Sequence, residues 1–216
     1  MEYPILYSFI RCPYAMRARM ALKLTNIKCE IREVRLNNKP KQMIDKSPKG
    51  TVPVLVLENE VIDESNDIIK WALRSNNIFD GNIDYDQIEL TNRLIELFDS
   101  KFKYNLDRYK YSTRYENIDQ ETHKRKCLDI LIYLESLISK EGWILGRKIN
   151  KLDISILPFI VSIGLLISNG LISKIKLKKS RKFYLIFLIQ TYLKMSCTNM
   201  MFGMRMPNLS FFPKRN

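Results

Sequence analysis

The chain has 216 residues, of which 46% are apolar and 11% aromatic, a composition that supports a buried core and argues against disorder. Its net charge of +13 is concentrated at one end, because residues 154–216 hold 10 basic residues and no Asp or Glu. A basic excess confined to one block, without RNA-stacking aromatic motifs or zinc-ligand spacing, argues against a nucleic-acid partner.

The N-terminal residues show no basic stretch followed by an apolar one, so the sequence predicts no secretory signal. The four cysteines are far apart and have no metal-ligand spacing. We therefore expect reduced thiols, no bound metal and a cytoplasmic protein. The cysteines are Cys12, Cys29, Cys127 and Cys197.

The first 76 residues alternate between strand and helix patterns. Short apolar runs predict strands, and apolar residues at helical spacing predict the helices between them. The order β-α-β-α-β-β-α predicts a thioredoxin-like domain over residues 1–76, with a four-stranded mixed sheet and helices on both faces. The predicted strands are 3–9, 28–34, 52–57 and 61–63, and the predicted helices are 13–26, 40–46 and 65–74.

Residues 77–86 are polar and turn-rich, which is typical of a linker. Residues 87–216 follow as an all-helical domain, with helices expected over 87–110, 119–140 and 151–168. The overall fold class is therefore α/β plus all-α. The uncharged stretch 154–172 is nearly long enough to span a membrane. Its Pro, Gly, Asn and Ser residues favour a central helix buried on all sides, so we expect no membrane association.

Cys12 stands directly before Pro13 at a predicted strand-to-helix junction. Free N–H groups and the positive end of the helix dipole favour a thiolate there, and the neighbouring Arg11 and Arg17 add positive charge. Ala15 occupies the second position of a dithiol motif, so no disulfide can close within this motif. The alternative is a cysteine that only packs, which is the commoner role of a single cysteine.

Two further sites could bind an extended ligand. A cis Val52–Pro53 bond would leave the backbone N–H and C=O of Val52 free to pair with a peptide, although a trans proline at a strand edge is an equal alternative. Glu64 and Ser65 open the last helix of the domain, where N–H groups and a hydroxyl can bind an anion and a carboxylate can bind an ammonium. A plain helix cap explains Ser65 equally well.

The order of these elements resembles the glutathione S-transferase superfamily, specifically its cysteine-type members, the omega class and related bacterial proteins. The matching segments are residues 11–15 (RCPYA), 38–40 (NKP), 47–55 (SPKGTVPVL) and 64–65 (ES).

The resemblance implies a glutathione site and a residue-by-residue assignment. Cys12 would meet the glutathione sulfur, and Val52 with Pro53 would pair with the cysteinyl backbone. Lys39 would contact the glycyl carboxylate, while Glu64 and Ser65 would hold the γ-glutamyl end. It also implies glutathione as co-substrate without a metal, a small-molecule or disulfide second substrate, and a homodimer.

The resemblance continues in the helical domain. Residues 143–159 resemble the family's loop and capping box before its central helix, in which Asn150 caps and Asp153 reaches back to free N–H groups. Tyr104, Tyr111 and Tyr115 are candidates for a second-substrate pocket, or simply exposed tyrosines. Between 161 and 206 the resemblance lapses, and one hypothesis is a shifted reading frame that resequencing would test.

The leading hypothesis is a glutathione-dependent thiol transferase or reductase that uses Cys12. The first alternative is conjugation of glutathione to electrophiles, which relies on a Ser or Tyr hydroxyl near the first strand. Ser8 and Tyr14 are present there, but Cys12 occupies the matching motif position. The second alternative is a non-catalytic interaction protein with the same fold.

Overall fold

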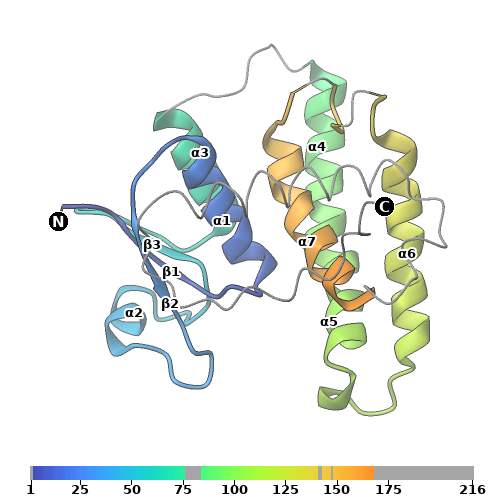
Figure 1. The fold of residues 1–216 in the computed structure, drawn as a ribbon, viewed down its shortest axis with the longest axis horizontal. Helices are drawn as coiled ribbons and strands as arrows, with labels where there is room; N and C mark the ends of the chain where they lie inside the picture. The colour runs from blue at the N-terminus through green and yellow to red at the C-terminus, as the bar shows by residue number, and fades with distance from the viewer. Residues whose placement is uncertain (1, 76–83, 141–142, 147, 168–216) are drawn as a thin grey trace, which may run out of the picture.

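A computed structural model describes residues 2–75, 84–140, 143–146 and 148–167. Its N-terminal domain contains a four-stranded sheet in the order β2-β1-β3-β4 (Figure 1). β1 pairs in parallel with β2, whereas β3 runs antiparallel to both β1 and β4. The predicted thioredoxin-like domain is confirmed. The strands are β1 (Ile5–Ser8), β2 (Glu30–Glu33), β3 (Val54–Val56) and β4 (Val61–Ile62).

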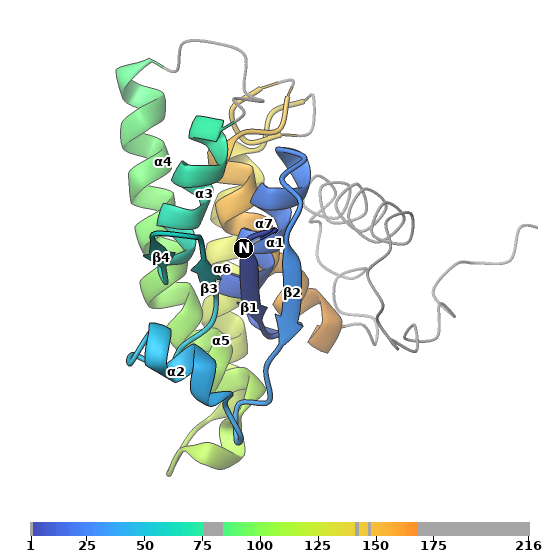
Figure 2. The same ribbon diagram turned by 90° about the vertical axis from the view of Figure 1, so that its left-hand side faces the viewer.

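Helices cover both faces of this sheet. α1 (Pro13–Leu24) and α3 (Ser65–Ser75) lie on the face toward the helical domain, and α2 (Lys41–Lys46) lies on the other (Figure 2). The alternation of side chains along β3 explains this arrangement. Leu55 belongs to the large core on the α1 side, while Val54 and Val56 pack in a smaller core with Met43 of α2.

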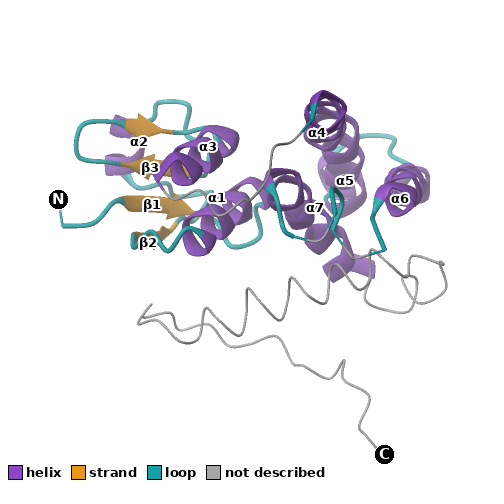
Figure 3. Cartoon of the chain, turned by 90° about the horizontal axis from the view of Figure 1, so that it is seen from above, coloured by secondary structure: helices purple, strands orange, loops and turns teal. Residues whose placement is uncertain are grey.

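The second domain is helical, as predicted (Figure 3). The helix expected over 87–110 consists of three consecutive segments, with a single π-helical turn in the middle. It also begins earlier than predicted, because Asp84 caps it at a position assigned to the linker. The described elements are α4 (Tyr85–Leu97), η1 (Phe98–Phe102), α5 (Lys103–Lys110), η2 (Ser112–Arg114), α6 (Gln120–Leu137) and α7 (Lys151–Ile167).

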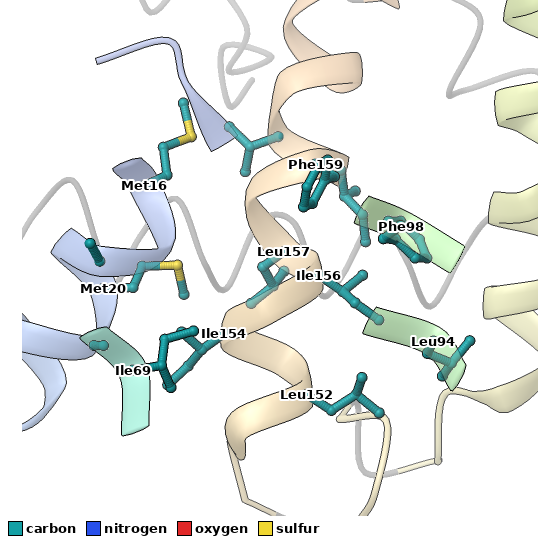
Figure 4. Packing of buried hydrophobic residues seen from close by; sticks show 14 of the residues in the cluster. Met16, Met20, Ile69, Leu94, Phe98, Leu152, Ile154, Ile156, Leu157 and Phe159 are labelled. Carbon is teal, nitrogen blue, oxygen red and sulfur yellow. The ribbon is translucent and has the colours of Figure 1, made fainter. Parts of the chain in front are cut away.

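α7 lies at the centre of the core that joins the two domains. Ile154 faces Ile69 and Met20 of the first domain, whereas Phe159 lies near Phe98 of η1 (Figure 4). From 152 to 163 every α7 residue is buried, which explains the absence of charge in this stretch. Within the described part of the chain, no helix is long and apolar enough to cross a membrane. Residues 168–172 of the uncharged stretch, and most of the atypical stretch 161–206, lie outside the described residues.

Arg17 links the two domains from the middle of α1. Its side chain is fully buried, and Nη2 lies 2.6 Å from Oδ1 of Asp99 on η1. Nε also donates to the carbonyl of Ser155 on α7 at 2.6 Å, and Nη1 donates to Ser65 Oγ at 3.4 Å. A buried guanidinium needs several such partners to offset its lost hydration. The packing of the domains therefore also fixes the start of α3.

Candidate functional site

Cys12 occupies the N-cap position of α1, immediately before Pro13. Its backbone is extended, with φ −84° and ψ 120°, and its carbonyl accepts the first helical hydrogen bond from Met16 N–H at 2.9 Å. Its own side chain does not cap the helix. The thiol therefore sits over the helix N-terminus, as the sequence predicted, and remains partly exposed.

The surroundings of Cys12 have opposing effects on the pKa of its thiol. Burial raises the pKa of the thiol, and this effect exceeds the opposing ones. The N–H groups of Ala15 and Tyr14 act to lower the pKa, followed by the charges of Lys103 and Arg19. The net effect favours the protonated thiol over the thiolate.

Two parts of the sequence-based expectation therefore need correction. The helix N-terminus does favour the thiolate, but it does not overcome burial. The largest cationic contributions to the pKa of the thiol come from Lys103 and Arg19, which the sequence did not indicate. Arg17 is instead committed to the buried ion pair with Asp99, and the sequence could not reveal that contact between domains.

Val52 is the direct neighbour of the thiol. The Val52–Pro53 bond is cis, which decides between the two alternatives that the sequence left open, and Cys12 Sγ donates to the Val52 carbonyl at 3.7 Å. The Val52 N–H has no backbone hydrogen-bond partner among the described residues. The backbone edge of Val52 therefore lies beside the thiol.

The turn before Val52 is fixed at both ends. Gly50 adopts φ +64°, a conformation that favours glycine, and its N–H donates to the Ser47 carbonyl at 3.0 Å. Ser47 Oγ donates to Asp63 Oδ2 at 2.7 Å, which ties this turn to the residue before Glu64. Lys39 is exposed. Its side chain lies beside the same turn, because Lys39 Nζ is 3.7 Å from the position that a Cβ atom would occupy on Gly50.

Glu64 and Ser65 open α3 as predicted, but with partners that the sequence did not indicate. The Glu64 carboxylate forms an ion pair with Lys49, and both side chains are well exposed. The Glu64 carbonyl accepts the first helical hydrogen bonds, so Glu64 rather than Ser65 holds the cap position. The Ser65 hydroxyl is buried and accepts a hydrogen bond from Arg17.

The other described cysteines lack the features of Cys12. Burial raises the pKa of Cys29 to about 11 and that of Cys127 to about 12, with no neighbouring charge or N–H group acting against it. Cys197 lies outside the described residues. Among the residues that the structure describes, no group of three or more His, Cys, Asp or Glu side chains could hold a metal ion.

Two of the three candidate tyrosines surround one arginine. The Arg108 guanidinium lies 3.4 Å from the Tyr104 ring centroid and 4.6 Å from that of Tyr115. Tyr111 instead lies between Lys110 and Arg114, at 5.4 Å and 4.4 Å from their charged groups. These tyrosines form cation–π contacts with basic residues rather than a shared apolar wall.

Comparison with known proteins identifies this arrangement. The family model "Glutathione S-transferase, N-terminal domain" matches residues 6–77, the segment that carries Cys12, Val52, Glu64 and Ser65. The chain is 44% identical over 50 residues to mouse glutathione S-transferase omega-1, a stretch that spans 23% of this chain and 21% of the mouse protein. The N-terminal domain therefore matches the glutathione S-transferase family in sequence.

Longer matches extend into the helical domain. The chain is 26% identical over 158 residues to the probable glutathione S-transferase parA of Nicotiana tabacum, which covers 72% of this chain and 70% of the tobacco protein. A glutathione transferase family member from Pseudomonas fluorescens, solved with two glutathione molecules bound, has a TM-score of 0.74 at 17% identity. That alignment covers 90% of this chain and 92% of the bacterial one, so both domains have the glutathione transferase fold.

Proposed function

We propose that this protein is a glutathione-dependent thiol transferase or reductase in which Cys12 is the reacting residue. The observation that carries the proposal is the position of the Cys12 thiol over the N-terminus of α1, 3.7 Å from the Val52 carbonyl. Glutathione would lie along Val52 with its sulfur next to Sγ of Cys12. No other described cysteine has N–H groups directed at its sulfur.

The proposed reaction consists of two thiol–disulfide exchanges. The Cys12 thiolate attacks the glutathione sulfur of a mixed disulfide, forming a Cys12–glutathione disulfide and releasing the other thiolate, which takes up a proton. A second glutathione thiolate then attacks the glutathione sulfur of that disulfide and releases Cys12 together with oxidised glutathione. Each step forms one S–S bond and breaks one, so electrons balance without a metal.

Val52 would couple ligand binding to the protonation of Cys12. In the free protein the thiol donates to the Val52 carbonyl, and such a bond favours the protonated form. The cysteinyl N–H of a bound glutathione would compete for this same oxygen. Once the thiol loses that acceptor, the N–H groups of Tyr14 and Ala15 favour the thiolate.

The ends of glutathione would be held by three charged or polar residues. Lys39 is exposed beside the 47–50 turn, where an ammonium can meet the glycyl carboxylate. Glu64 and Ser65 would hold the γ-glutamyl group at the start of α3. Because Glu64 is paired with Lys49 in the free protein, the γ-glutamyl ammonium would compete with Lys49 for the carboxylate.

Conjugation of glutathione to electrophiles is the alternative function, and the surroundings of the two hydroxyls disfavour it. The Ser8 side chain is buried and accepts a hydrogen bond from Arg19. The Tyr14 hydroxyl donates to the Asp99 carbonyl at 3.4 Å, and burial raises its pKa well above the usual value. Neither hydroxyl is ready to stabilise a glutathione thiolate.

The test compares wild type with Cys12→Ser and Cys12→Ala, using a glutathione mixed disulfide and a simple aryl halide. Serine cannot form a disulfide, so Cys12→Ser should reduce thiol transfer to the uncatalysed rate while keeping or raising conjugation. Cys12→Ala should depress both. Full disulfide-reducing activity in Cys12→Ser would refute the cysteine mechanism. Retention on immobilised glutathione tests the remaining alternative, a non-catalytic protein, which should bind little.

The same proposal includes three expectations about context. A homodimer would join the first domain of each copy to the helical domain of the other, which sedimentation analysis can test. The second substrate would be a small molecule or a disulfide. A cytoplasmic location would keep the thiols reduced, as the proposed exchange requires.

A further inference from the structure

One face of α5 points toward the start of α1. Lys103, Asp107 and Lys110 are four and three residues apart, so they share a face of this helix. The Lys103 ammonium lies 5.7 Å from the ring centroid of Tyr14, two residues after Cys12. The face that carries these three charges therefore borders the reacting thiol.

The positive charge on this face is only partly neutralised. Lys103 and Asp107 form an ion pair with each other. Lys110 is half-buried, and no carboxylate forms an ion pair with it in the described part of the chain. The sequence after residue 153 contains no Asp or Glu at all, so it cannot supply one. Burial, followed by repulsion from Arg11, lowers the pKa of Lys110, and the opposing charge of Asp107 does not offset this.

Arg11 adds a second cation next to the thiol. It directly precedes Cys12, is exposed, and lies 5.5 Å from the Phe9 ring centroid. Its charge also acts on Lys110, so the two cations are close enough to repel each other. Two like charges beside one reactive atom are stabilised when an anion lies between them.

We propose that Lys110 and Arg11 bind an anionic group of the second substrate, such as a carboxylate, sulfonate or phosphate on the disulfide or electrophile that reacts at Cys12. This inference rests on the proposed function, because it assumes that the substrate reacts at that thiol. The preferred substrates are then negatively charged rather than neutral or cationic.

A purely structural role for Lys110 is the competing explanation. It is the last residue of α5, where a cation stabilises the negative end of the helix dipole. That role would change the melting temperature of a variant, but it would not make Cys12 distinguish reagents by their charge. The measurement must therefore report charge discrimination at the thiol itself.

The experiment measures alkylation of Cys12 by iodoacetate, an anion, and by iodoacetamide, its neutral analogue, with the modified peptide quantified by mass spectrometry. Both reagents consume the same thiolate and release iodide, so their rate ratio cancels any change in thiol pKa. Removing one cation near the sulfur should lower the ratio of iodoacetate to iodoacetamide rates by about threefold to tenfold. We expect this for Lys110→Gln and for Arg11→Gln.

Two further variants serve as controls. Lys101→Gln removes an exposed charge of η1 that lies outside the face formed by Lys103, Asp107 and Lys110, so the ratio should stay at the wild-type value. Lys110→Arg keeps the charge and should also preserve the ratio. An unchanged ratio in folded Lys110→Gln and Arg11→Gln would overturn the inference.

The outcome can be separated from that of the proposed function. Alkylation needs no glutathione, whereas the proposed function requires a glutathione adduct on Cys12. If the adduct forms but the ratio is insensitive to Lys110 and Arg11, only the anion site is wrong. If no adduct forms, the proposed function fails and Lys110 and Arg11 no longer define a second-substrate site.

Discussion

The N-terminal ends of α1 and α7 show two opposite uses of the same structural feature. At α7, Asn150 Oδ1 accepts from the N–H groups of Leu152 and Asp153 at 2.8 Å and 3.3 Å. The Asp153 carboxyl accepts from Asn150 N–H at 2.8 Å and from Ile144 N–H at 3.1 Å. The side chains of Asn150 and Asp153 thus accept hydrogen bonds from the backbone N–H groups at this helix start, which allows it to be buried in the core.

The start of α1 has no such side-chain cap. Its N-cap is Cys12, whose thiol does not bond the helix, and its first turn contains no acidic residue. The free N–H groups point instead at a sulfur that is partly exposed. The capped start of α7 therefore stabilises the fold, whereas the N–H groups at the start of α1 remain available to stabilise a thiolate on Cys12.

The largest predicted effect comes from removing the cap of α7. Asp153→Ala leaves two buried N–H groups without an acceptor, so we expect a loss of about 2–4 kcal/mol in the free energy of unfolding. Burial raises the pKa of Asp153 to about 7, above its value in the unfolded chain. The stabilisation from its protonation is present at low pH and lost as pH rises through 7, so the destabilisation should be larger at pH 5 than at pH 8.

Chemical denaturation of wild type and variant at both pH values measures this prediction. Asp129→Ala, an exposed carboxylate of α6, is the matched control and should change stability little at either pH. Equal losses for Asp153→Ala at pH 5 and pH 8 would contradict the raised pKa.

The second prediction concerns Cys12 at the start of α1, which has no side-chain cap. Because burial raises the pKa of Cys12 above that of an ordinary thiol, its alkylation rate should still rise about tenfold per pH unit near pH 8 and continue rising past pH 9. Lys103→Gln should shift the profile further toward high pH. A rate that levels off below pH 8 in the free protein would show that the helix N-terminus outweighs burial.

The smallest effects come from a matched pair of N-cap substitutions. Asn150→Ala should cost about 1 kcal/mol, because it removes a side-chain cap. Cys12→Ala should cost well under 1 kcal/mol, since the thiol makes only a long contact with the Val52 carbonyl. Thermal unfolding of both variants measures the difference. A larger loss for Cys12→Ala would mean that the thiol is mainly structural.

The sequence predicted the fold well where the pattern is local. The strand and helix order of residues 1–76, the caps at Asn150 and Asp153 and the buried nature of α7 all follow from short-range periodicity and capping residues. The start of α4 was misplaced because several Asn and Asp residues between Asn76 and Asp84 could each cap a helix, so the cap at Asp84 did not stand out.

The candidate site was predictable in its parts but not in its electrostatics. Cys12 and Val52 meet as expected, because each belongs to a local motif. The charges around them come from elsewhere in the chain. Lys103 acts on the thiol across 91 residues of sequence, and Lys49 rather than a ligand pairs with Glu64. Such contacts depend on how the domains pack, and no local pattern encodes them.

The most direct test of the central claim is to incubate the wild-type protein with oxidised glutathione and map the adduct by intact-mass and peptide analysis. The account predicts one glutathione, linked to Cys12, with Cys29 and Cys127 unmodified because burial raises the pKa of both thiols and no N–H group or charge opposes it. Folding is checked first by circular dichroism. A folded protein that carries the adduct mainly on Cys29 or Cys127, or carries none, would contradict the claim.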